Sequence, residues 1–339
     1  KEEEDVKDQC LDLAFVQLCL CLLVVTVMIT LVVGRNSTEP TREEPPPKKK
    51  KRHGRVIVCT FAGRQDRMPL LCAYVKRAIR DGIVDEFHVW DFCRQTSDRE
   101  WLETWCAKEC SPAIQLHKPV VSSHLPRWNG FYHYYSQRHT DYSVHDVFLK
   151  VDDDVVEWDV NTLASWVEFR QQHPHYWLVS GNVVNNGVCA YTQQQEKRLP
   201  DDVIGPLSYP PKGLCGTLWE RADLCVRLHE WTLDQPIGQL AFSDAVELPV
   251  GDRISINAVA WLGSDWKHIA SVFSQHSDDE HMMSVVLPTV LKRPNIVFGP
   301  WTASHLSFFK QEEQSVFQSA LPRLLDRYRK RAQEQRLIS

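Results

Sequence analysis

Three consecutive carboxylates, Asp152, Asp153 and Asp154, interrupt an apolar run near the middle of the chain. The run from Val147 to Val156 reads VFLKVDDDVV, and its β-branched and aromatic residues favour a buried strand. Adjacent carboxylates repel one another, and a helix cap explains one of them rather than three. A divalent cation would neutralise them, because Mg²⁺ and Mn²⁺ prefer oxygen ligands. The sequence therefore predicts a metal site at these three residues that holds phosphate oxygens.

A second acidic group follows much later, where residues 277–283 read SDDEHMM. A carboxylate at this position is either a helix cap or a general base that takes a proton from an attacking hydroxyl. We assign the base role to Asp279 and keep Glu280 as the alternative. His305 lies in the otherwise apolar run FGPWTASHLSFF. A lone histidine of this kind is usually a core residue, and it becomes a candidate metal ligand because a metal site is already predicted.

The elements that must position these residues begin at Arg55. Residues 56–62 (VIVCTFA) predict a buried strand, 69–81 a helix and 87–92 (FHVWDF) a second strand. This order opens an α/β sheet, in which ligands bind at the carboxyl ends of the strands. No GxGxxG follows the first strand, so the dinucleotide fingerprint is absent. The candidates for contacts with a nucleotide are Thr60, Ala62, Arg64 and Asp91; packing explains Thr60 and Ala62 almost as well.

Further along, the aromatic segment 128–139 predicts a helix, from which only Arg138 is a candidate for the nucleotide site. Residues 177–184 predict a strand that ends at Asn185-Asn186-Gly187, a turn that either reaches the site or closes a hairpin. Residues 193–205 read as a polar, mobile connection. The segment YPPKGLCGTLWE, residues 209–220, combines prolines with glycines and suggests a rigid entrance followed by a close backbone approach.

An apolar segment at residues 13–33 carries no charge and is long enough to cross a bilayer as a helix. We expect a tail at 1–12, a membrane anchor at 13–33, a linker rich in Pro and Lys at 34–54, a catalytic domain at 55–310 and a charged helical surface tail at 311–339. A cleaved signal peptide is the rival interpretation, although its apolar core is usually shorter and ends in small residues.

The charges and the cysteines disagree about the side of the membrane on which the domain lies. Basic residues follow the span, which favours a cytosolic domain, whereas eight cysteines outside the N-terminal segment suit disulfides in a lumen. The net charge of −5 and the pI near 6.3 argue against a generally basic nucleic-acid-binding protein, so no nucleic-acid partner is expected.

The stretch FLKVDDDVV resembles the Asp-x-Asp strand end of GT-A fold glycosyltransferases, and in particular the β-1,3-galactosyltransferase-type type II membrane enzymes. YPPKGLCG is similar to the acceptor loop of that family, and SDDEHMM occupies the place of its acidic base motif. The glycine loop departs from the family, because GLCG replaces a plain glycine run. The resemblance covers residues 55–310 in architecture and only these short motifs in residues.

The resemblance implies an α/β fold of GT-A type, a Rossmann-like nucleotide-binding sheet with helices on both faces, preceded by a single transmembrane helix. It further implies an inverting, metal-dependent transfer from a nucleotide-sugar, a UDP-sugar by preference, to a hydroxyl of a glycan or glycoprotein. Asp152, Asp154 and His305 would hold Mn²⁺ or Mg²⁺, and Asp153 would orient the donor sugar or ribose. The expected location is the Golgi or ER membrane, with the N-terminal helix in the bilayer and the domain in the lumen.

Two other classes of function remain open at this point. A metal-dependent phosphohydrolase or nuclease also clusters carboxylates around divalent metals. A non-catalytic, membrane-tethered carbohydrate-binding scaffold would keep the fold without metal dependence, and the acidic residues in both motifs count against it.

Overall fold

The computed structural model describes residues 54–120, 125–208, 216–269 and 278–338. The predicted membrane span, the linker and the YPPKGLC segment lie outside these residues. Within them, no helix combines the length and the apolar character that a membrane crossing requires. The compact unit extends from Arg52 to Ser339.

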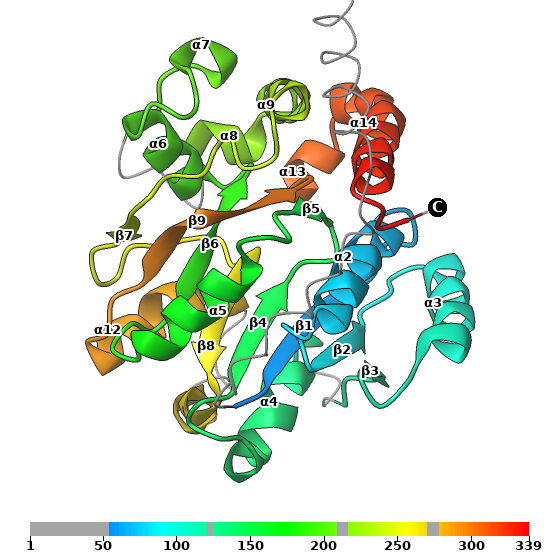
Figure 1. Ribbon diagram of the computed structural model, residues 1–339, viewed down its shortest axis with the longest axis vertical. Helices are drawn as coiled ribbons and strands as arrows, with labels where there is room; N and C mark the ends of the chain where they lie inside the picture. Colours follow the sequence, from blue (N-terminus) through cyan, green and yellow to red (C-terminus); the bar gives the residue numbers. More distant parts are fainter. Residues whose placement is uncertain (1–53, 121–124, 209–215, 270–277, 339) are drawn as a thin grey trace, which may run out of the picture. The chain divides into compact units, whose positions relative to one another are not determined.

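The centre of this unit is a mixed sheet with the order β3-β2-β1-β4-β8-β6-β9-β5 (Figure 1). Strand β7 lies outside this order and pairs with β9. The strands are β1 (Val56–Ala62), β2 (Glu86–Asp91), β3 (Ile114–His117), β4 (Val147–Val151), β5 (Val155–Trp158), β6 (Val179–Val184), β7 (Ala245–Glu247), β8 (Ala258–Leu262) and β9 (Ile296–His305). Strands β1 to β4 are parallel, β8 is antiparallel to both β4 and β6, and β9 is parallel to β6.

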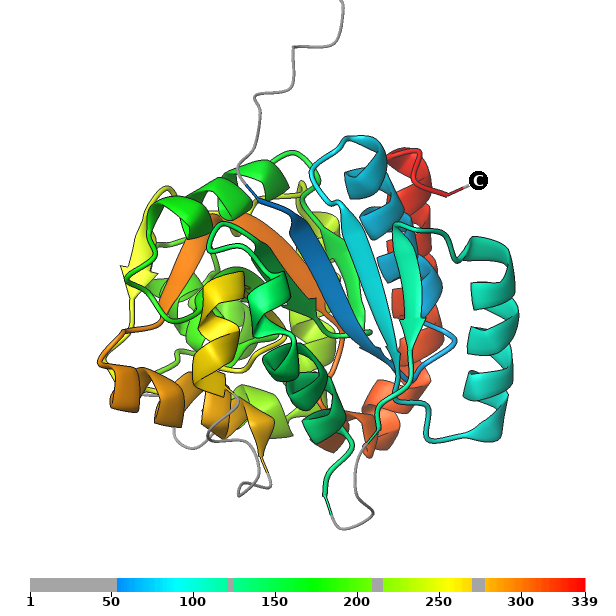
Figure 2. The same cartoon turned by 90° about the horizontal axis from the view of Figure 1, so that it is seen from below.

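Helices cover both faces of the sheet, as Figure 2 shows edge-on. They are α2 (Met68–Arg80), α3 (Thr96–Glu109), α4 (Trp128–Gln137), α5 (Leu163–Gln172), α6 (Gly187–Gln195), α7 (Asp201–Ile204), α8 (Gly216–Glu220), α9 (Ala222–Asp234), α10 (Trp266–Ile269), α11 (Asp279–His281), α12 (Leu287–Leu291), α13 (Phe309–Glu312) and α14 (Ser315–Glu334). A π-helical turn, Met282–Val286, joins α11 to α12.

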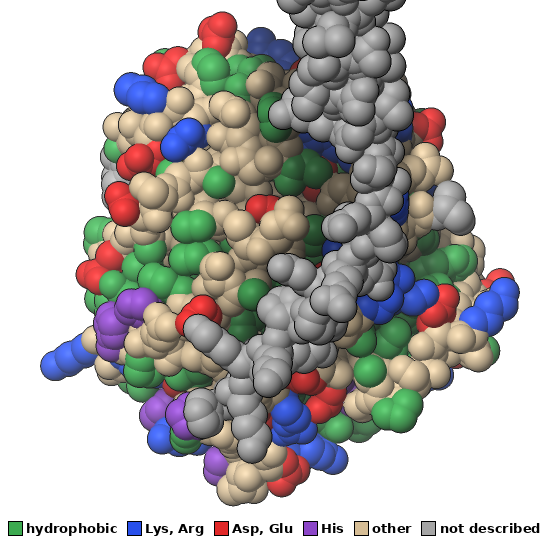
Figure 3. All heavy atoms as spheres, in the orientation of Figure 1, with side chains coloured by type: hydrophobic (Ala, Val, Ile, Leu, Met, Phe, Trp, Pro, Cys, Tyr) green, Lys and Arg blue, Asp and Glu red, His purple; other side chains and the backbone are tan. Residues whose placement is uncertain are grey.

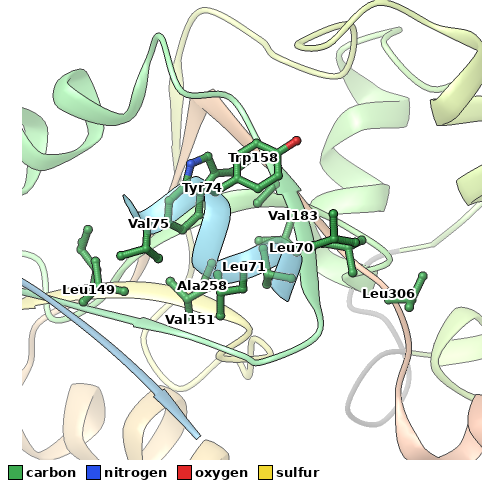
Figure 4. Close-up of a cluster of buried hydrophobic side chains, with 14 of the residues drawn as sticks. Leu70, Leu71, Tyr74, Val75, Leu149, Val151, Trp158, Val183, Ala258 and Leu306 are labelled. Atoms are coloured by element: carbon green, nitrogen blue, oxygen red, sulfur yellow. The ribbon is translucent and has the colours of Figure 1, made fainter. Parts of the chain in front are cut away.

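The two faces of the sheet bury separate apolar clusters, because successive strand residues point to opposite faces. Val56 and Val58 of β1 belong to one cluster, and Ile57 and Cys59 belong to the other. In the first cluster, apolar side chains of α2 meet those of β4 and its neighbours (Figure 4). Helix α2 begins with Pro69 in its first turn, where the missing N–H costs nothing. Helix α4 and Trp266 pack on the second face.

This topology brings several chain ends to one edge of the sheet. Strands β1, β2, β4, β6 and β9 all run toward that edge, so the residues that follow them meet there. Strand β8 runs in the opposite direction, and therefore its first residues begin at the same edge. Residue Asp152, directly after β4, donates its backbone N–H to the carbonyl of Asn257, directly before β8, at 2.8 Å.

One segment in the second half of the chain differs from the sequence expectation. Residues 193–205 are not a mobile connection, because α6 continues to Gln195 and α7 begins at Asp201. Gln193 is buried, and its amide nitrogen donates to Asn182 Oδ1 at 2.7 Å inside the protein.

The C-terminal segment is also different from the predicted surface tail. Helix α14 is amphipathic and buries an apolar face in the first core cluster. Its Arg331 forms an ion pair with the buried Glu157 of β5 at 3.0 Å. The charged residues that suggested a solvent-exposed helix account for only one of its faces, so residues 315–334 are part of the folded unit.

The expectation of disulfides is not met among the described residues. Seven cysteines there are free, namely Cys59, Cys72, Cys93, Cys106, Cys110, Cys189 and Cys225. All except Cys110 are buried. Burial raises the pKa of the Cys189 thiol to about 12, as expected for cysteines that act as small apolar core residues.

Candidate active site

Asp152, Asp154 and His305 come together at the carboxyl edge of the sheet. One ligand atom of each residue lies within 4.8 Å of the other two. His305 Nε2 is 3.2 Å from Asp154 Oδ1 and 3.7 Å from Asp152 Oδ2. Strands β4 and β9 are separated by β8 and β6 in the sheet, and they supply these residues only because both end at this edge. The structure therefore brings together the three residues that we predicted as metal ligands.

The chemistry of this cluster fits a divalent cation such as Mn²⁺. Two carboxylate oxygens and one imidazole nitrogen form a donor set that suits this ion. Asp154 is 1% exposed, yet its Oδ1 has no hydrogen-bond partner in the described structure. A buried carboxylate oxygen without a partner is costly unless a cation is bound. Although burial disfavours its charge, His305 and Arg64 hold the pKa of Asp154 well below its usual range.

Asp153 points away from the cluster and toward the loop after β1. Its Oδ2 accepts the backbone N–H of Gly63 at 2.7 Å, and its Oδ1 pairs with Arg64. Burial raises the pKa of Asp153 to about 6 in spite of the Arg64 guanidinium. This carboxylate joins the ends of β1 and β4. Its predicted role toward a donor sugar or ribose stays a prediction.

Arg67, at the start of α2, is a buried residue of the site that we did not predict. It lies 3.4 Å from Asp154 Oδ2 and donates to Ser307 Oγ at 3.0 Å and Glu312 Oε1 at 2.6 Å. Its side chain is 4% exposed, in contrast to that of Arg64, which is 32% exposed. Arg67 thus neutralises Asp154 from inside the protein, and Arg64 is the guanidinium open to a bound anion.

The backbone of Leu306 fixes the position of His305. Its N–H donates to the carbonyl of Asp154 at 2.9 Å, which ties the end of β9 directly to the metal-ligand candidates. Its carbonyl accepts from His229 Nε2 at 2.9 Å. Burial lowers the pKa of His229 to about 4, so this imidazole is neutral at physiological pH and serves as a fixed hydrogen-bond donor.

Lys150 connects the two acidic motifs. It is 4% exposed in a central strand, where its Nζ donates to Asp152 Oδ1 at 2.5 Å and to the carbonyl of Ile256 at 3.0 Å. Burial opposes its charge, but Asp152 and Asp279 outweigh this effect and raise the pKa of Lys150. A fixed ammonium group between the metal-ligand candidates and the predicted base explains how so many carboxylates share one edge of the sheet.

The three carboxylates of the second motif have different partners. Asp278 caps α11 through the N–H of His281 at 3.1 Å, and Arg253 pairs with it at 2.6 Å. Arg253 also pairs with Glu280 at 2.9 Å. Asp279 instead accepts a hydrogen bond from the hydroxyl of Tyr132 at 3.3 Å and faces Lys150 electrostatically. Asp279 is therefore the carboxylate of this motif that no arginine pairs with in the described structure.

Both remaining candidates for the base are harder to ionise than ordinary carboxyls. Burial raises the pKa of Asp279, although Lys150 opposes this shift. Burial raises the pKa of Glu280 to about 7 in spite of Arg253. Raised carboxyl pKa values of this kind are common for proton-transfer groups, which work best near the ambient pH.

The fold places the other candidate residues for nucleotide contacts in different parts of the sheet. Thr60 and Ala62 are buried in β1, and the hydroxyl of Thr60 has no hydrogen-bond partner in the described structure. Asp91 lies at the end of β2, where it accepts from the backbone of Cys93 at 3.1 Å and from Arg99 at 3.3 Å. Ala62 and Asp91 share the edge of the sheet with the metal-ligand candidates, whereas Thr60 lies inside the sheet.

Arg138 is not brought to this edge. It follows α4 and stacks on Tyr134, 4.0 Å from the ring centroid. The next turn contacts Arg55, which precedes β1, through the carbonyl of Asp141 at 3.1 Å. Arg138 thus lies toward the amino end of β1, opposite to the cluster, because α4 runs antiparallel to the strand. The aromatic residues of α4 pack in or against the second apolar cluster.

Signals for the residues that we missed exist in the sequence but are weak. Lys150 is a charge inside an apolar strand, and Asn257 is a polar residue inside the run INAVAWL. Each interrupts a buried pattern, which indicates a polar partner without naming it. Arg253 lies shortly before this run, and only the fold brings it to Glu280.

Comparisons with known proteins do not assign this chain to a family. No protein-family model matches the chain, and no curated protein matches it either. Among solved structures, 4-diphosphocytidyl-2C-methyl-D-erythritol synthase matches with 10% identity and a TM-score of 0.36, over 81% of this chain and 100% of that one. CMP:2-keto-3-deoxy-manno-octonic acid synthetase, complexed with CTP, matches with 8% identity and a TM-score of 0.42, over 83% and 100%. Both TM-scores are below 0.5, so neither likeness supports an inference about this chain.

Proposed function

We propose that this protein is a metal-dependent glycosyltransferase of GT-A type, which moves a sugar from a nucleotide-sugar to a hydroxyl acceptor. The observation that carries the proposal is the convergence of Asp152, Asp154 and His305 within 4.8 Å at the carboxyl edge of an α/β sheet. The resemblance of FLKVDDDVV to the β-1,3-galactosyltransferase-type enzymes supports a UDP-sugar as the donor and a glycan or glycoprotein as the acceptor.

Asp152, Asp154 and His305 would hold the metal, with Mn²⁺ preferred over Mg²⁺ because of the imidazole. A bound cation would neutralise the charge that develops on the departing diphosphate. The exposed part of Arg64 is close enough to the cluster to contact a phosphate oxygen, since its Nη1 lies 3.6 Å from Asp154.

Asp279 is the proposed general base. It takes the proton of the acceptor hydroxyl, the acceptor oxygen forms a bond with the anomeric carbon, and the bond from that carbon to the nucleoside diphosphate breaks. The diphosphate leaves with the electron pair. A direct displacement of this kind inverts the anomeric centre. Tyr132 and Lys150 orient the base and favour its ionised form.

The test is a donor screen on the purified full-length chain. UDP and GDP release are followed from a panel of nucleotide-sugars, with Mn²⁺ and with a chelator. We expect metal-dependent release from one UDP-sugar, increased by a suitable acceptor. Phosphate release without any sugar donor would indicate a phosphohydrolase or nuclease, and pyrophosphate release from CTP would indicate nucleotidyl transfer. Sugar binding without turnover or metal dependence would indicate a scaffold.

A further inference from the structure

Two buried asparagines connect the start of α6 to the metal-ligand candidates. The Oδ1 of Asn186 accepts the N–H groups of Val188 and Cys189, at 3.1 and 3.3 Å, and so caps α6. Its Nδ2 donates to Asn257 Oδ1 at 3.1 Å and to the carbonyl of Ser255 at 3.1 Å. Asn186 is fully buried, and Asn257 is 3% exposed. We call this pair the amide relay.

The relay ends on Asp152. Asn257 Nδ2 donates to Asp152 Oδ2 at 3.1 Å. This is the oxygen that faces His305 Nε2 at 3.7 Å, whereas Lys150 holds the other oxygen at 2.5 Å. The rotation of this carboxylate is therefore fixed from both sides.

The two amide groups of the relay can be oriented in only one way. Backbone N–H groups of α6 can only donate, so they require the amide oxygen of Asn186. Its amide nitrogen must then face the oxygen of Asn257, which turns the amide nitrogen of Asn257 toward Asp152. A carboxylate can only accept, so this direction satisfies every buried group in the series.

We propose that Asn186 and Asn257 are positioning residues that orient Asp152 toward a divalent cation. This inference rests on the proposed function, because it requires a metal at the cluster. Groups that orient metal ligands typically contribute about 10- to 100-fold in metal affinity. The two residues act through Asp152 and need no contact with substrate.

Asn186→Asp separates this role from helix capping. The new carboxylate still accepts from the N–H groups of α6, and acidic residues are good caps. It has no N–H to donate to Asn257. The amide of Asn257 can then satisfy the new carboxylate only by rotating, which turns its oxygen toward Asp152. We expect the protein to stay folded and to bind Mn²⁺ about 10-fold more weakly.

Asn182→Asp is the matched control. Asn182 is also fully buried, lies in β6 just before Asn186, and donates to the carbonyls of Leu240 at 2.7 Å and Gly299 at 3.3 Å. The same chemical change there buries a carboxylate away from the relay, so it tests the effect of lower stability alone. Asn257→Leu is a second variant, in which the leucine side chain is similar in size to asparagine but has no polar group. It should also weaken Mn²⁺ binding.

The experiment titrates Mn²⁺ into the full-length chain, alone and with UDP, and follows free Mn²⁺ by electron paramagnetic resonance. Thermal unfolding of each variant is recorded by circular dichroism. We expect weaker Mn²⁺ binding in Asn186→Asp and Asn257→Leu, and wild-type affinity in Asn182→Asp. Wild-type affinity in Asn186→Asp, or an equal loss in Asn182→Asp, would overturn the relay and leave the metal site standing. A wild-type chain that binds no Mn²⁺ would overturn the proposed function, and the relay with it.

Discussion

Asp279 and Glu280 are neighbours in the sequence, but their side chains have different partners. Arg253 pairs with Glu280 at 2.9 Å, whereas Asp279 accepts from the Tyr132 hydroxyl at 3.3 Å. The guanidinium of Arg253 occupies the Glu280 carboxylate and restricts its approach to an acceptor hydroxyl, whereas no arginine pairs with Asp279 in the described structure. The structure therefore favours Asp279 as the base and gives Glu280 the role of a partner for Arg253.

Asp279→Asn should reduce sugar transfer by about 100-fold or more, because general base catalysis contributes on this scale. Binding of UDP with Mn²⁺ should stay near the wild-type value, as measured by calorimetry. Glu280→Gln keeps an oxygen that accepts from Arg253 and should change the rate by only a few-fold. If the two variants lost activity in the opposite order, the base would be Glu280.

The pH dependence of transfer should report the raised pKa of Asp279. The base works only when ionised, so activity should be lost as the pH falls through a value above the ordinary range for aspartate. Burial is the main cause of the shift, and the negative charge of Asp278 adds to it. Asp278→Asn, which retains a residue able to cap α11, should therefore move the acid limb of kcat/KM to lower pH. An unchanged or higher limb would contradict the assignment.

Asp154→Ala should abolish metal-dependent transfer and weaken Mn²⁺ binding by at least about 10-fold, since even an outer partner of a ligand contributes this much. The variant also removes the contact of Oδ2 with the buried Arg67 at 3.4 Å, so thermal unfolding is recorded beside Mn²⁺ binding to separate the loss of a ligand from a loss of stability. Asp66→Ala is a suitable control, because that carboxylate is nearby in the fold but half exposed, and it lies 3.7 Å from Arg67. Full turnover in Asp154→Ala would contradict the metal assignment.

At the scale of elements, α14 closes the first core cluster beside α2 and β5. Its Arg331 reaches Glu157 at 3.0 Å, and the side chains are 13% and 6% exposed. The helix also contributes Tyr328, whose hydroxyl donates to His229 Nδ1 at 2.7 Å behind the metal-ligand candidates. The C-terminal helix thus supports the site although its residues lie far from it in the sequence.

Arg331→Ala should destabilise the protein by about 3 kcal/mol, because it leaves the Glu157 carboxylate buried without its cation. Arg329→Ala on the same helix removes an exposed pair with Asp326 at 2.8 Å, and it should cost less than about 0.5 kcal/mol. Urea unfolding of the two variants measures the difference. Equal stabilities would mean that α14 adds little to the folded unit.

At the scale of the whole molecule, one compact unit contains every described site residue. Acidic and basic side chains are interspersed over the described part of the face in Figure 3, without a single basic stripe there. The absence of a nucleic-acid partner stays a prediction from the net charge of −5.

A lumenal domain in the Golgi or ER, anchored through residues 13–33, stays our proposal on the basis of the resemblance and the apolar segment. Protease added to sealed vesicles should then leave the domain intact until detergent is added. The known cytosolic tail of a marker protein in the same vesicles serves as the control for access. Digestion without detergent would place the domain in the cytosol, as the basic residues after the segment favour.

The sequence by itself determined the elements with strong local patterns. Strand β1 has the predicted bounds, and α2, β2 and α4 begin and end within a few residues of their predicted bounds. The acidic residues after β4 were also visible, because repeated charges beside a buried strand violate the local pattern and need a cation. His305 was selected correctly as a member of the cluster only because a metal site had already been predicted.

Only the tertiary structure decided how these residues are held. Asn257 is 105 residues from Asp152, and Asn186 is 71 residues from Asn257. No local pattern encodes such hydrogen bonds, because they depend on the antiparallel register of β8 between β4 and β6. The same reason explains why the sequence could not show that Arg253 pairs with Glu280 or that Arg138 lies toward the amino end of β1. The sequence determines which chemical groups are present, and the order of the strands in the sheet determines which of these groups come into contact.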